Sequence, residues 1–386
     1  MKYDFDKLVS RRGTNSEKWD ESDIEDLIPL WVADMDFQTY PPIIEALHER
    51  VEHGVFGYTH VPDSYYDAII HWFQQQHGWT GIRRRDIIYT TGVVPAVSAI
   101  IRALTLPGDK VLVQTPVYNC FFSSIRNQGC VVNEAPLRRI DLPAEDGMVQ
   151  GFTYDTDWEA FESACADVKT RIFLLCNPHN PAGRMWTPEE LRRMGDICQK
   201  HHVFVIADEI HGELAMPGYK YTPFASLGEE YALNSSTCVS PTKGFNIAGL
   251  QIANIIVADA DKRERIDRAI NIHEICEVNP FGVIALQEAY TDGGAEWLRQ
   301  LCAYVHDNYR LLRSAFPQYP VARLEGTYLA WMDVQDSAVF ASKALRSKVW
   351  VNAGGMYGDA TGRYVRVNLA SPRTLLQEAF RRINGN

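Results

Sequence analysis

The sequence lacks the paired cysteines, long apolar runs and basic blocks that would assign it to several large classes of protein. Its eight cysteines are scattered through 386 residues without a C-x-x-C pair, and several lie in apolar runs such as RIFLLC. We interpret them as buried free thiols of a reducing compartment. No run approaches about 18 apolar residues, and the opening MKYDFDKLVSRRG carries no apolar signal-peptide core. We therefore expect a soluble, cytoplasmic protein without a membrane partner.

Positive charge is also scarce, since 38 lysines and arginines face 49 aspartates and glutamates, for a net charge of −11. The longest basic block is the three arginines at 83–85. This balance argues against nucleic acid or an anionic membrane as the main partner. No G-x-G-x-x-G follows the first strand expected in the α/β region, which disfavours a nicotinamide-dependent dehydrogenase. No metal site is predicted.

What the sequence does contain is an alternation of short apolar runs with helical patterns between residues 85 and 258. The apolar runs are nearly continuous, as in strands whose sheet is covered on both faces. We predict strands over residues 86–91, 110–114, 171–176, 202–208, 236–240 and 253–258. One helix is predicted to begin at a capping box of Thr187 and Glu190, with Pro188 at its first position. The region is therefore predicted to be an α/β domain with a mostly parallel sheet.

The length predicts more than one domain, because a domain typically has about 150 residues. From about residue 286 the pattern changes to long helical stretches, then TYLAWMDV, the glycine-rich NAGGMYGDATG and the short strand YVRVNLA. We predict a large domain over residues 45–285 and a smaller α+β domain over residues 286–386. Residues 1–44 are expected to pack with the smaller domain.

Polar groups follow several of the predicted strands, where α/β sheets bind their ligands. After DIIYTT, the turn into GVVPAVS exposes the backbone N–H groups of Val93 and Val94 at a helix N-terminus that suits a phosphate. The alternative is an ordinary helix cap. After RIFLLC, NPHNPAG presents Asn180, fixed by Pro181, as a side-chain donor. Asparagine before proline is also a common turn signal, so both readings stay open.

Two charged residues follow later strands of the same region. Asp208 ends the apolar run HVFVIA, where a carboxylate is costly unless it is paired or well hydrogen-bonded. Lys243 lies in SPTKGFNIAGL, three residues after Ser240. A lysine held at a rigid strand-to-loop junction can have its pKa lowered enough to form a Schiff base, whereas a solvated loop lysine needs no such junction.

Asn180, Asp208 and Lys243 come in this order, each just past a predicted strand, at separations of 28 and 35 residues. With TGVVPAVS, this pattern resembles the aminotransferase class I and II family of fold type I pyridoxal 5′-phosphate (PLP) enzymes. The resemblance runs from WVADMDF at Trp31 to VRVNLASPRTLLQEAF at the end. Within it, WVADMDF, FGYT, NPHNPAG, DEIH and FNIAGLQ are most similar to the cystathionine β-lyase (C–S lyase) branch. It implies a mostly parallel central sheet in a large PLP-binding domain, with a smaller α+β domain.

The resemblance implies roles around the cofactor ring. Lys243 would form the Schiff base and, once displaced by the substrate amine, act as the base on the Cα proton. Asp208 would pair with the pyridine N–H, and Asn180 would hydrogen-bond the phenolic oxygen. Tyr118 in TPVYNCF would stack on the ring face. His211, at a position often occupied by tyrosine in transaminases, would reach the same oxygen or line the pocket.

The resemblance also implies contacts with the phosphate. Val93 and Val94 N–H and the Ser240 hydroxyl would bind it, and Tyr58 of FGYT would reach the phosphate of a neighbouring subunit. A homodimer with shared sites is therefore expected, although Tyr58 could simply close a turn. Many relatives carry a basic residue eight positions after the Schiff-base lysine, where this sequence has Gln251. The phosphate charge would then be met mainly by the helix N-terminus, hydroxyls and solvent.

Arg366 in YVRVNLA resembles the arginine that clamps the substrate α-carboxylate, and backbone near Ala33 would face the same group. A strand arginine on a solvated face is the alternative. The reaction implied is α,β-elimination from cystathionine and related cysteine S-conjugates, giving a thiol, pyruvate and ammonia. An aminotransferase would use the same residues. A non-enzymatic regulator of the same fold is a third reading, but partner binding would not require Lys243, Asp208, Asn180 and Arg366 together.

Overall fold

The computed structural model of the protein describes residues 2–144, 151–272 and 278–385, and Cys276, one of the cysteines predicted to be buried, lies outside them. Its larger part contains a seven-stranded sheet of order β2-β10-β9-β8-β7-β3-β4. Neighbours from β9 to β4 are parallel, and β10 is antiparallel to both β2 and β9, so the predicted mostly parallel sheet is confirmed. The strands are β2 (Ile87–Thr90), β3 (Lys110–Val113), β4 (Val131–Glu134), β7 (Thr170–Cys176), β8 (Phe204–Asp208), β9 (Ser235–Val239) and β10 (Ala253–Ile256).

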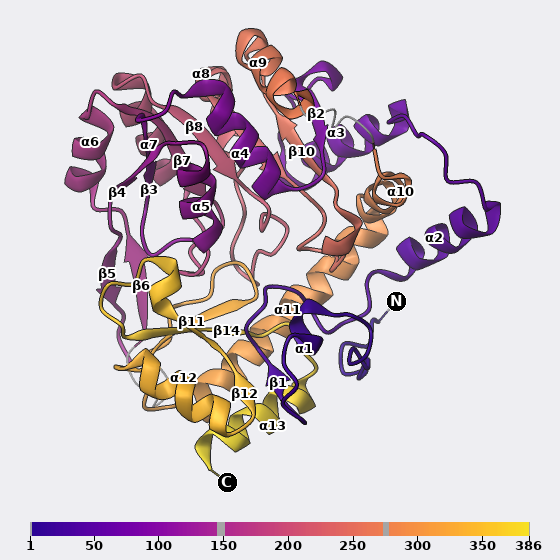
Figure 1. Ribbon diagram of the computed structural model, residues 1–386, viewed down its shortest axis with the longest axis vertical. Helices are drawn as coiled ribbons and strands as arrows, with labels where there is room; N and C mark the ends of the chain where they lie inside the picture. Colours follow the sequence, from indigo (N-terminus) through magenta and orange to yellow (C-terminus); the bar gives the residue numbers. More distant parts are fainter. Residues whose placement is uncertain (1, 145–150, 273–277, 386) are drawn as a thin grey trace.

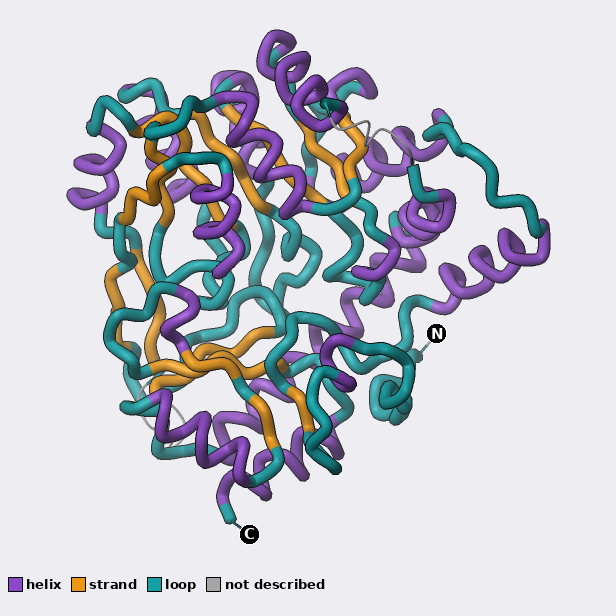
Figure 2. The backbone as a smooth tube through the Cα atoms, viewed as in Figure 1, coloured by secondary structure: helices purple, strands orange, loops and turns teal. Residues whose placement is uncertain are grey.

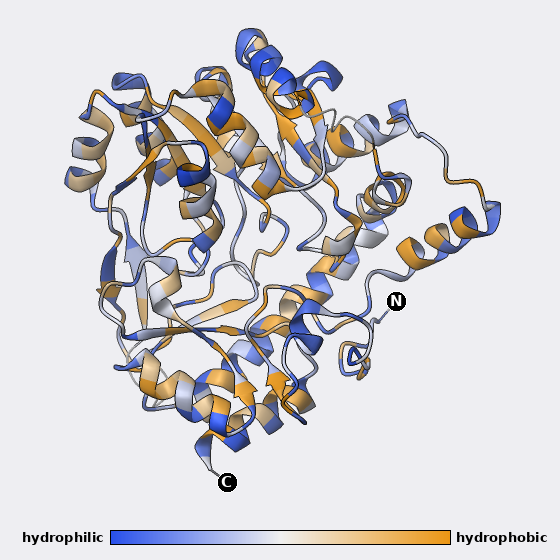
Figure 3. Cartoon of the chain, viewed as in Figure 1, coloured by the Kyte–Doolittle hydropathy of each residue, from blue (hydrophilic) through white to orange (hydrophobic). Residues whose placement is uncertain are grey.

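Helices cover both faces of this sheet (Figures 1 and 2). Alternate side chains of β7 enter opposite cores, with Ile172 and Leu174 in one and Phe173 and Leu175 in the other. This explains the nearly continuous apolar runs, which Figure 3 shows mostly in orange. One core is closed by α4 (Val93–Leu104), α5 (Asn119–Asn127) and α9 (Ala260–Asn271), and the other by α6 (Trp158–Ala166), α7 (Pro188–Lys200) and α8 (Glu229–Leu233).

Two local features test the sequence patterns. The capping box of α7 is confirmed, because Glu190 N donates to Thr187 Oγ1 at 3.2 Å and Thr187 N donates to Glu190 Oε2 at 2.8 Å. Strand β4 was not predicted. Its residues VVNE lie at the sheet edge and are exposed or half-buried, so they lack the apolar run of the inner strands.

The C-terminal part is built on a three-stranded antiparallel sheet of order β11-β14-β13. Its strands are β11 (Leu329–Asp333), β13 (Asn352–Ala353) and β14 (Tyr364–Asn368), and its helices are α11 (Asp292–Ala315), α12 (Ser337–Arg346) and α13 (Arg373–Asn384). The N-terminal segment joins it, because β1 (Ile28–Pro29) pairs in parallel with β12 (Val349–Trp350). Smaller elements are α1 (Glu17–Asp20), the pair β5 (Arg138–Asp141) and β6 (Phe152–Asp155), and the 3₁₀ helices η1 (Arg84–Asp86), η2 (Phe224–Leu227), η3 (Ala248–Leu250) and η4 (Gly354–Tyr357).

Three helices connect the two parts: α2 (Pro41–His53), α3 (Asp63–His77) and α10 (Pro280–Ala289). α10 packs against both α2 and α3, and it spans the predicted boundary at residue 285. The outer end of α2 and residues 54–62 stand away from the body of the molecule (Figure 1). The domain limits at residues 44 and 285 stay a prediction. Among the residues described, none of the helices has the length and apolarity needed to cross a bilayer.

A buried ion-pair cluster fixes the N-terminal segment. The Lys18 side chain is 0% exposed, and its Nζ donates to Asp36 Oδ2 at 2.9 Å. Asp36 also accepts from Trp19 Nε1, Ser371 Oγ and Arg11 Nη1 at 2.6–3.0 Å. Burial by itself would raise the pKa of Asp36, but Lys18 and these donors outweigh it and hold the pKa below its ordinary value.

Replacing Lys18 by methionine should destabilise the protein strongly, because Asp36 would remain buried without its closest cation. Breaking a buried pair costs about 3–5 kcal/mol, and Arg11 keeps the expected loss near the lower figure. Denaturant unfolding measures the change. The control Lys200→Met breaks an exposed pair with Glu162 and should cost less than about 1 kcal/mol. Equal losses in the two variants would contradict the buried-pair explanation.

Candidate active site

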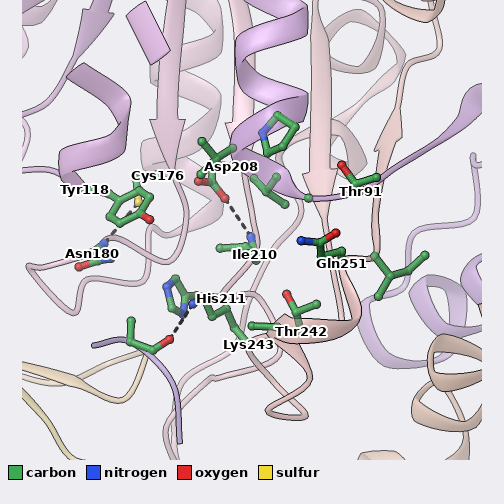
Figure 4. Close-up of a pocket in the computed structure, with 17 residues that line it drawn as sticks. Thr91, Tyr118, Cys176, Asn180, Asp208, Ile210, His211, Thr242, Lys243 and Gln251 are labelled. Atoms are coloured by element: carbon green, nitrogen blue, oxygen red, sulfur yellow. Dashed lines mark hydrogen bonds between the residues drawn. The ribbon is translucent and has the colours of Figure 1, made fainter. Parts of the chain in front are cut away.

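A cavity of about 210 Å³ lies at the carboxyl edge of the large sheet (Figure 4). Its walls come from the loops after β2, β3, β7, β8 and β9, together with the N-terminal segment and residues just before β10. Parallel strands end at a common edge, which is why residues far apart in the sequence meet there. Predicted site residues that line the cavity are Ala33, Val93, Val94, Tyr118, Asn180, Asp208, His211 and Lys243.

One end of the cavity is formed by the start of α4. Gly92 is the N-cap, and α4 begins at Val93, so the unpaired N–H groups of its first turn lie at the cavity wall. Thr91 and Gln251 lie beside this turn, on the side of the cavity opposite Tyr118 and Asn180 (Figure 4). Helix N-termini bind anions through backbone donors and the helix dipole. This end therefore suits an anionic group.

The Lys243 amine lies on the floor of the cavity as drawn in Figure 4. Its Nζ donates to the Ala33 carbonyl at 2.6 Å, and that carbonyl also accepts from the Tyr328 hydroxyl at 2.9 Å. Burial lowers the pKa of Lys243 below its ordinary value, and the positive charge of Arg366 lowers it further against the attraction of Asp34. A lysine with a lowered pKa has more of the neutral amine that attacks a carbonyl group.

Asp208, the last residue of β8, points its carboxylate into the cavity (Figure 4). Its Oδ1 accepts from Ile210 N at 3.2 Å. Burial raises the pKa of Asp208 to about 7, against the Ile210 hydrogen bond and the attraction of Lys243. A ligand that brought an N–H or a positive charge to this carboxylate would therefore be held strongly.

Asn180 and Arg366 interact directly, across 186 residues of sequence. Arg366 Nη1 donates to Asn180 Oδ1 at 3.3 Å, and Nη2 donates to the Trp31 carbonyl at 2.7 Å. Arg366 is 4% exposed, and its guanidinium lies over the Tyr357 ring, 4.7 Å from its centroid. Within the described residues, Arg366 Nε has no hydrogen-bond partner. The solvated-strand alternative for Arg366 is therefore wrong.

His211 and Tyr118 complete the walls. Burial lowers the pKa of His211 to about 3, and the charges of Lys243 and Arg366 lower it in the same direction, so the imidazole is neutral. Its Nδ1 is buried and finds no partner in the described part of the chain. Burial raises the pKa of Tyr118, which therefore keeps its hydroxyl proton.

Arg366 does not line this cavity itself but donates to Asn180, which does. Two further predicted residues also lie outside the cavity lining. The Ser240 hydroxyl donates to the Ile252 carbonyl at 2.5 Å and lies 2.7 Å from Thr242 Oγ1, so it sits behind Thr242. Tyr58 is 95% exposed on the connection between α2 and α3, away from the cavity of its own chain. Their assigned contacts with a phosphate stay predictions.

Several lining residues escaped the sequence analysis. Thr91, Cys176, Ile210 and Thr242 line the cavity. Each lies within three residues of a strand end, so strand-end position was the available signal. Tyr328 was also missed; it does not line the cavity but contacts two residues that do, through its hydroxyl to the Ala33 carbonyl and its ring edge-on to His211.

Comparison with known proteins gives the same picture over the whole chain. The aminotransferase class I and II family matches residues 25–383. A Bacillus subtilis (strain 168) protein named cystathionine beta-lyase PatB is 38% identical over 392 residues, covering 98% of each chain. Cystalysin from Treponema denticola, whose structure contains a pyridoxal 5′-phosphate cofactor, superposes with a TM-score of 0.91 at 34% identity, covering 100% of this chain and 98% of that one. A PLP-bound putative aminotransferase from Clostridium difficile 630 has a TM-score of 0.91 at 37% identity, covering 99% of each chain.

The sheet, its carboxyl-edge cavity and these neighbours define an α/β protein of fold type I. The chain belongs to the aminotransferase class I and II family. The resemblance inferred from the sequence, including its cystathionine β-lyase branch, is confirmed.

The raised pKa of Asp208 makes a prediction for the ligand-free protein. A carboxyl group that titrates at about 7 when folded and near 3.8 when unfolded stabilises the fold at low pH, and this stabilisation is lost as the pH rises from about 4 to 7. Relative to Asp208→Asn, the ligand-free wild type should lose up to about 1.4 kcal/mol of unfolding free energy per pH unit in this window. Denaturant unfolding at several pH values measures this difference. Glu209, whose pKa burial also raises to about 7, is present in both proteins and cancels. A constant difference across the window would show that Asp208 titrates normally.

Proposed function

We propose that the protein is a PLP-dependent carbon–sulfur β-lyase that converts cystathionine and related cysteine S-conjugates into a thiol, pyruvate and ammonia. The observation that carries the proposal is one cavity holding a lysine amine of lowered pKa and a buried carboxylate. Behind its lining residue Asn180 lies the Arg366 guanidinium, whose Nε–H has no partner among the described residues. The relatives described above supply the reaction class, since the Bacillus subtilis protein carries the name cystathionine beta-lyase.

The residues fit PLP in both shape and polarity. The α4 N-terminus, with Val93 and Val94, would hold the phosphate at one end of the cavity, and the Thr91 hydroxyl lies beside it. The Tyr118 ring would lie against the face of the pyridine ring. The unpartnered Nδ1 of His211 is a further polar atom in the cavity that a ligand can satisfy.

Three residues would then contact the ring and its substituents. Asp208 would accept the pyridine N–H, which replaces the solvation its carboxylate lacks. Asn180 would donate through Nδ2 to the phenolic oxygen, because its Oδ1 already accepts from Arg366. Lys243 would hold the cofactor covalently through its amine.

When bound, PLP supplies an electron sink that makes the Cα proton of an amino acid acidic. Lys243 would take that proton, and its lowered pKa suits a base that works near neutral pH. With a thiolate at Cβ, the C–S bond breaks and the sulfur leaves with the bonding electrons. The remaining three-carbon fragment hydrolyses to pyruvate and ammonia.

Arg366 would bind the α-carboxylate of the substrate. Of its five N–H groups, one on Nη1 and one on Nη2 are used by Asn180 and Trp31. Three N–H groups remain, one each on Nε, Nη1 and Nη2, and the buried Nε has no partner among the described residues. Two of these donors would bind a carboxylate through both of its oxygens. Backbone near Ala33 would border the same subsite.

An aminotransferase is the second candidate, favoured by the similarity to the PLP-bound putative aminotransferase of Clostridium difficile 630. Both reactions begin with proton removal at Cα and use the residues already named. A regulator without catalysis is disfavoured, because partner binding would not require this set of residues.

We propose in addition a homodimer with shared sites. Val51, Val55, Phe56 and Tyr58 are 53–95% exposed on α2 and the segment after it, and an apolar projection of this kind suits contact with a second copy. Tyr58 would reach the partner's phosphate from there. Gln251 lines the cavity without a positive charge, so a contact from the partner's tyrosine would help to bind the phosphate.

A cytoplasmic location is proposed because the cysteines of the described residues are free and mostly buried thiols.

Incubation with L-cystathionine in the absence of any keto acid tests the reaction. The lyase releases equal amounts of pyruvate, ammonia and thiol over many turnovers, and Lys243→Ala should release none. A single turnover that resumes only after addition of 2-oxoglutarate or another keto acid would establish the aminotransferase instead.

Replacing Arg366 by alanine should lower kcat/KM for cystathionine about 30- to 150-fold, because a charge-assisted two-point contact with a carboxylate contributes about 2–3 kcal/mol. Affinity for PLP should change far less. Arg363→Ala is the matched control, since Arg363 lies just before β14 but is exposed and does not line the cavity. Its partner Asp333 is buried and keeps a second ion pair with Arg139. An unchanged kcat/KM in the Arg366 variant would put this arginine outside the substrate site.

A further inference from the structure

Residues 31–37 border the cavity at Ala33, and we call this segment the 31–37 strap. Its carbonyl groups point alternately in different directions. The Trp31 carbonyl accepts from Arg366 Nη2 at 2.7 Å, and the Ala33 carbonyl accepts from Lys243 Nζ at 2.6 Å. Two main-chain oxygens of one segment thus contact the two cations of the site. A shift of this segment would therefore move both the Arg366 guanidinium and the Lys243 amine.

Asn368 holds the strap on either side of Ala33. Its Nδ2 donates to the Val32 carbonyl and to the Asp34 carbonyl, each at 2.6 Å. Its Oδ1 accepts from Ala370 N at 2.8 Å, so all the polar atoms of the carboxamide are used and its orientation is fixed. The side chain is fully buried at the end of β14, two residues beyond Arg366.

Two further asparagines hold the ends of the strap. Asn352 of β13 donates through Nδ2 to the Trp31 carbonyl at 3.1 Å and to the Tyr357 hydroxyl at 3.0 Å. Asn246, three residues after Lys243, donates through Nδ2 to the Met35 and Phe37 carbonyls at 3.0 and 2.8 Å. Its Oδ1 accepts from Met35 N at 3.0 Å. Each asparagine comes from a different part of the chain.

The amide is the chemical group that this arrangement needs. A carboxamide NH₂ donates two hydrogen bonds without a charge, so it can bridge two carbonyls in a closed site without altering the field around Lys243 and Arg366. Asn368 binds the carbonyls of Val32 and Asp34, whereas the Ala33 carbonyl between them accepts from Lys243, so neighbouring carbonyls of the strap are committed to different partners.

We propose that Asn368, Asn352 and Asn246 are positioning residues that hold the 31–37 strap so that its carbonyls orient the Arg366 guanidinium and the Lys243 amine for an amino-acid substrate. This inference rests on the proposed function. The asparagines act through the strap, so their loss should weaken binding of the amino acid. Cofactor affinity should change little, because the phosphate and ring contacts come from the edge of the large sheet.

The test uses two variants of the full-length holoenzyme, Asn368→Ser and Asn352→Ala. The second is included because Asn352 is only half-buried, so its replacement is less disruptive to folding. L-Alanine is the probe, since it has the carboxylate and amine but no leaving group at Cβ. Its Kd, from the change in cofactor absorbance, should rise about tenfold, the equivalent of one net hydrogen bond. PLP affinity of the stripped protein should change less than about threefold. KM for cystathionine should rise with the L-alanine Kd, while kcat falls less.

Asn133→Ser is the matched control. Its Nδ2 also donates two hydrogen bonds, to the Ala164 carbonyl at 3.0 Å and Thr170 Oγ1 at 2.9 Å, but it lies on β4 and does not contact the strap. It should leave the L-alanine Kd unchanged. Wild-type L-alanine affinity in both strap variants, with only a lower unfolding temperature, would overturn the proposal, as would an equal loss in the control. If the wild type releases no pyruvate from cystathionine, the lyase assignment fails, yet L-alanine binding still decides the role of the strap.

Discussion

The hydrogen bond from the Lys243 amine to the Ala33 carbonyl joins two segments that are 210 residues apart. It lies where the N-terminal segment borders the cavity beside the large sheet. The charged groups there are buried, and this loss of solvation is the first cause of the shifted pKa values of Lys243, Asp208 and His211. The chemical character of the site therefore depends on the placement of the N-terminal segment as much as on the identity of the side chains.

The N-terminal segment is held in that place by buried polar interactions on two sides. On the side away from the cavity, Lys18 and Asp36 form an ion pair that further donors satisfy. On the other side, Asn368 bridges two strap carbonyls and ties the segment to β14, which also carries Arg366. Buried charges and carbonyls are costly when they lack partners, so this network permits few alternative positions of the strap.

Sequence patterns succeeded where the physical signal is local. The inner strands were predicted because both of their faces are covered and most of their side chains are apolar, as in β7 and β8. The α7 capping box was predicted because its two side chains bond within a single turn. Strand β4 was missed because an edge strand with exposed side chains carries no such run. The sequence also predicted that one cavity would contain Asn180, Asp208 and Lys243, because each follows a strand and parallel strands end at the same edge of a sheet.

The sequence by itself determined the alternation of strands and helices, the edge at which polar residues gather and, through its motifs, the family. Only the tertiary structure decided which hydroxyl faces the cavity, Thr242 rather than Ser240, because Ser240 donates instead to the carbonyl of Ile252, just before β10. The tertiary structure also decided that Arg366 is buried with an unpartnered Nε–H. It decided in addition that three asparagines donate hydrogen bonds to carbonyls of the strap. The physical reason is the same in each case. A hydrogen bond between distant segments has direction and a length set by packing, and neither is encoded in the spacing of residues along the chain.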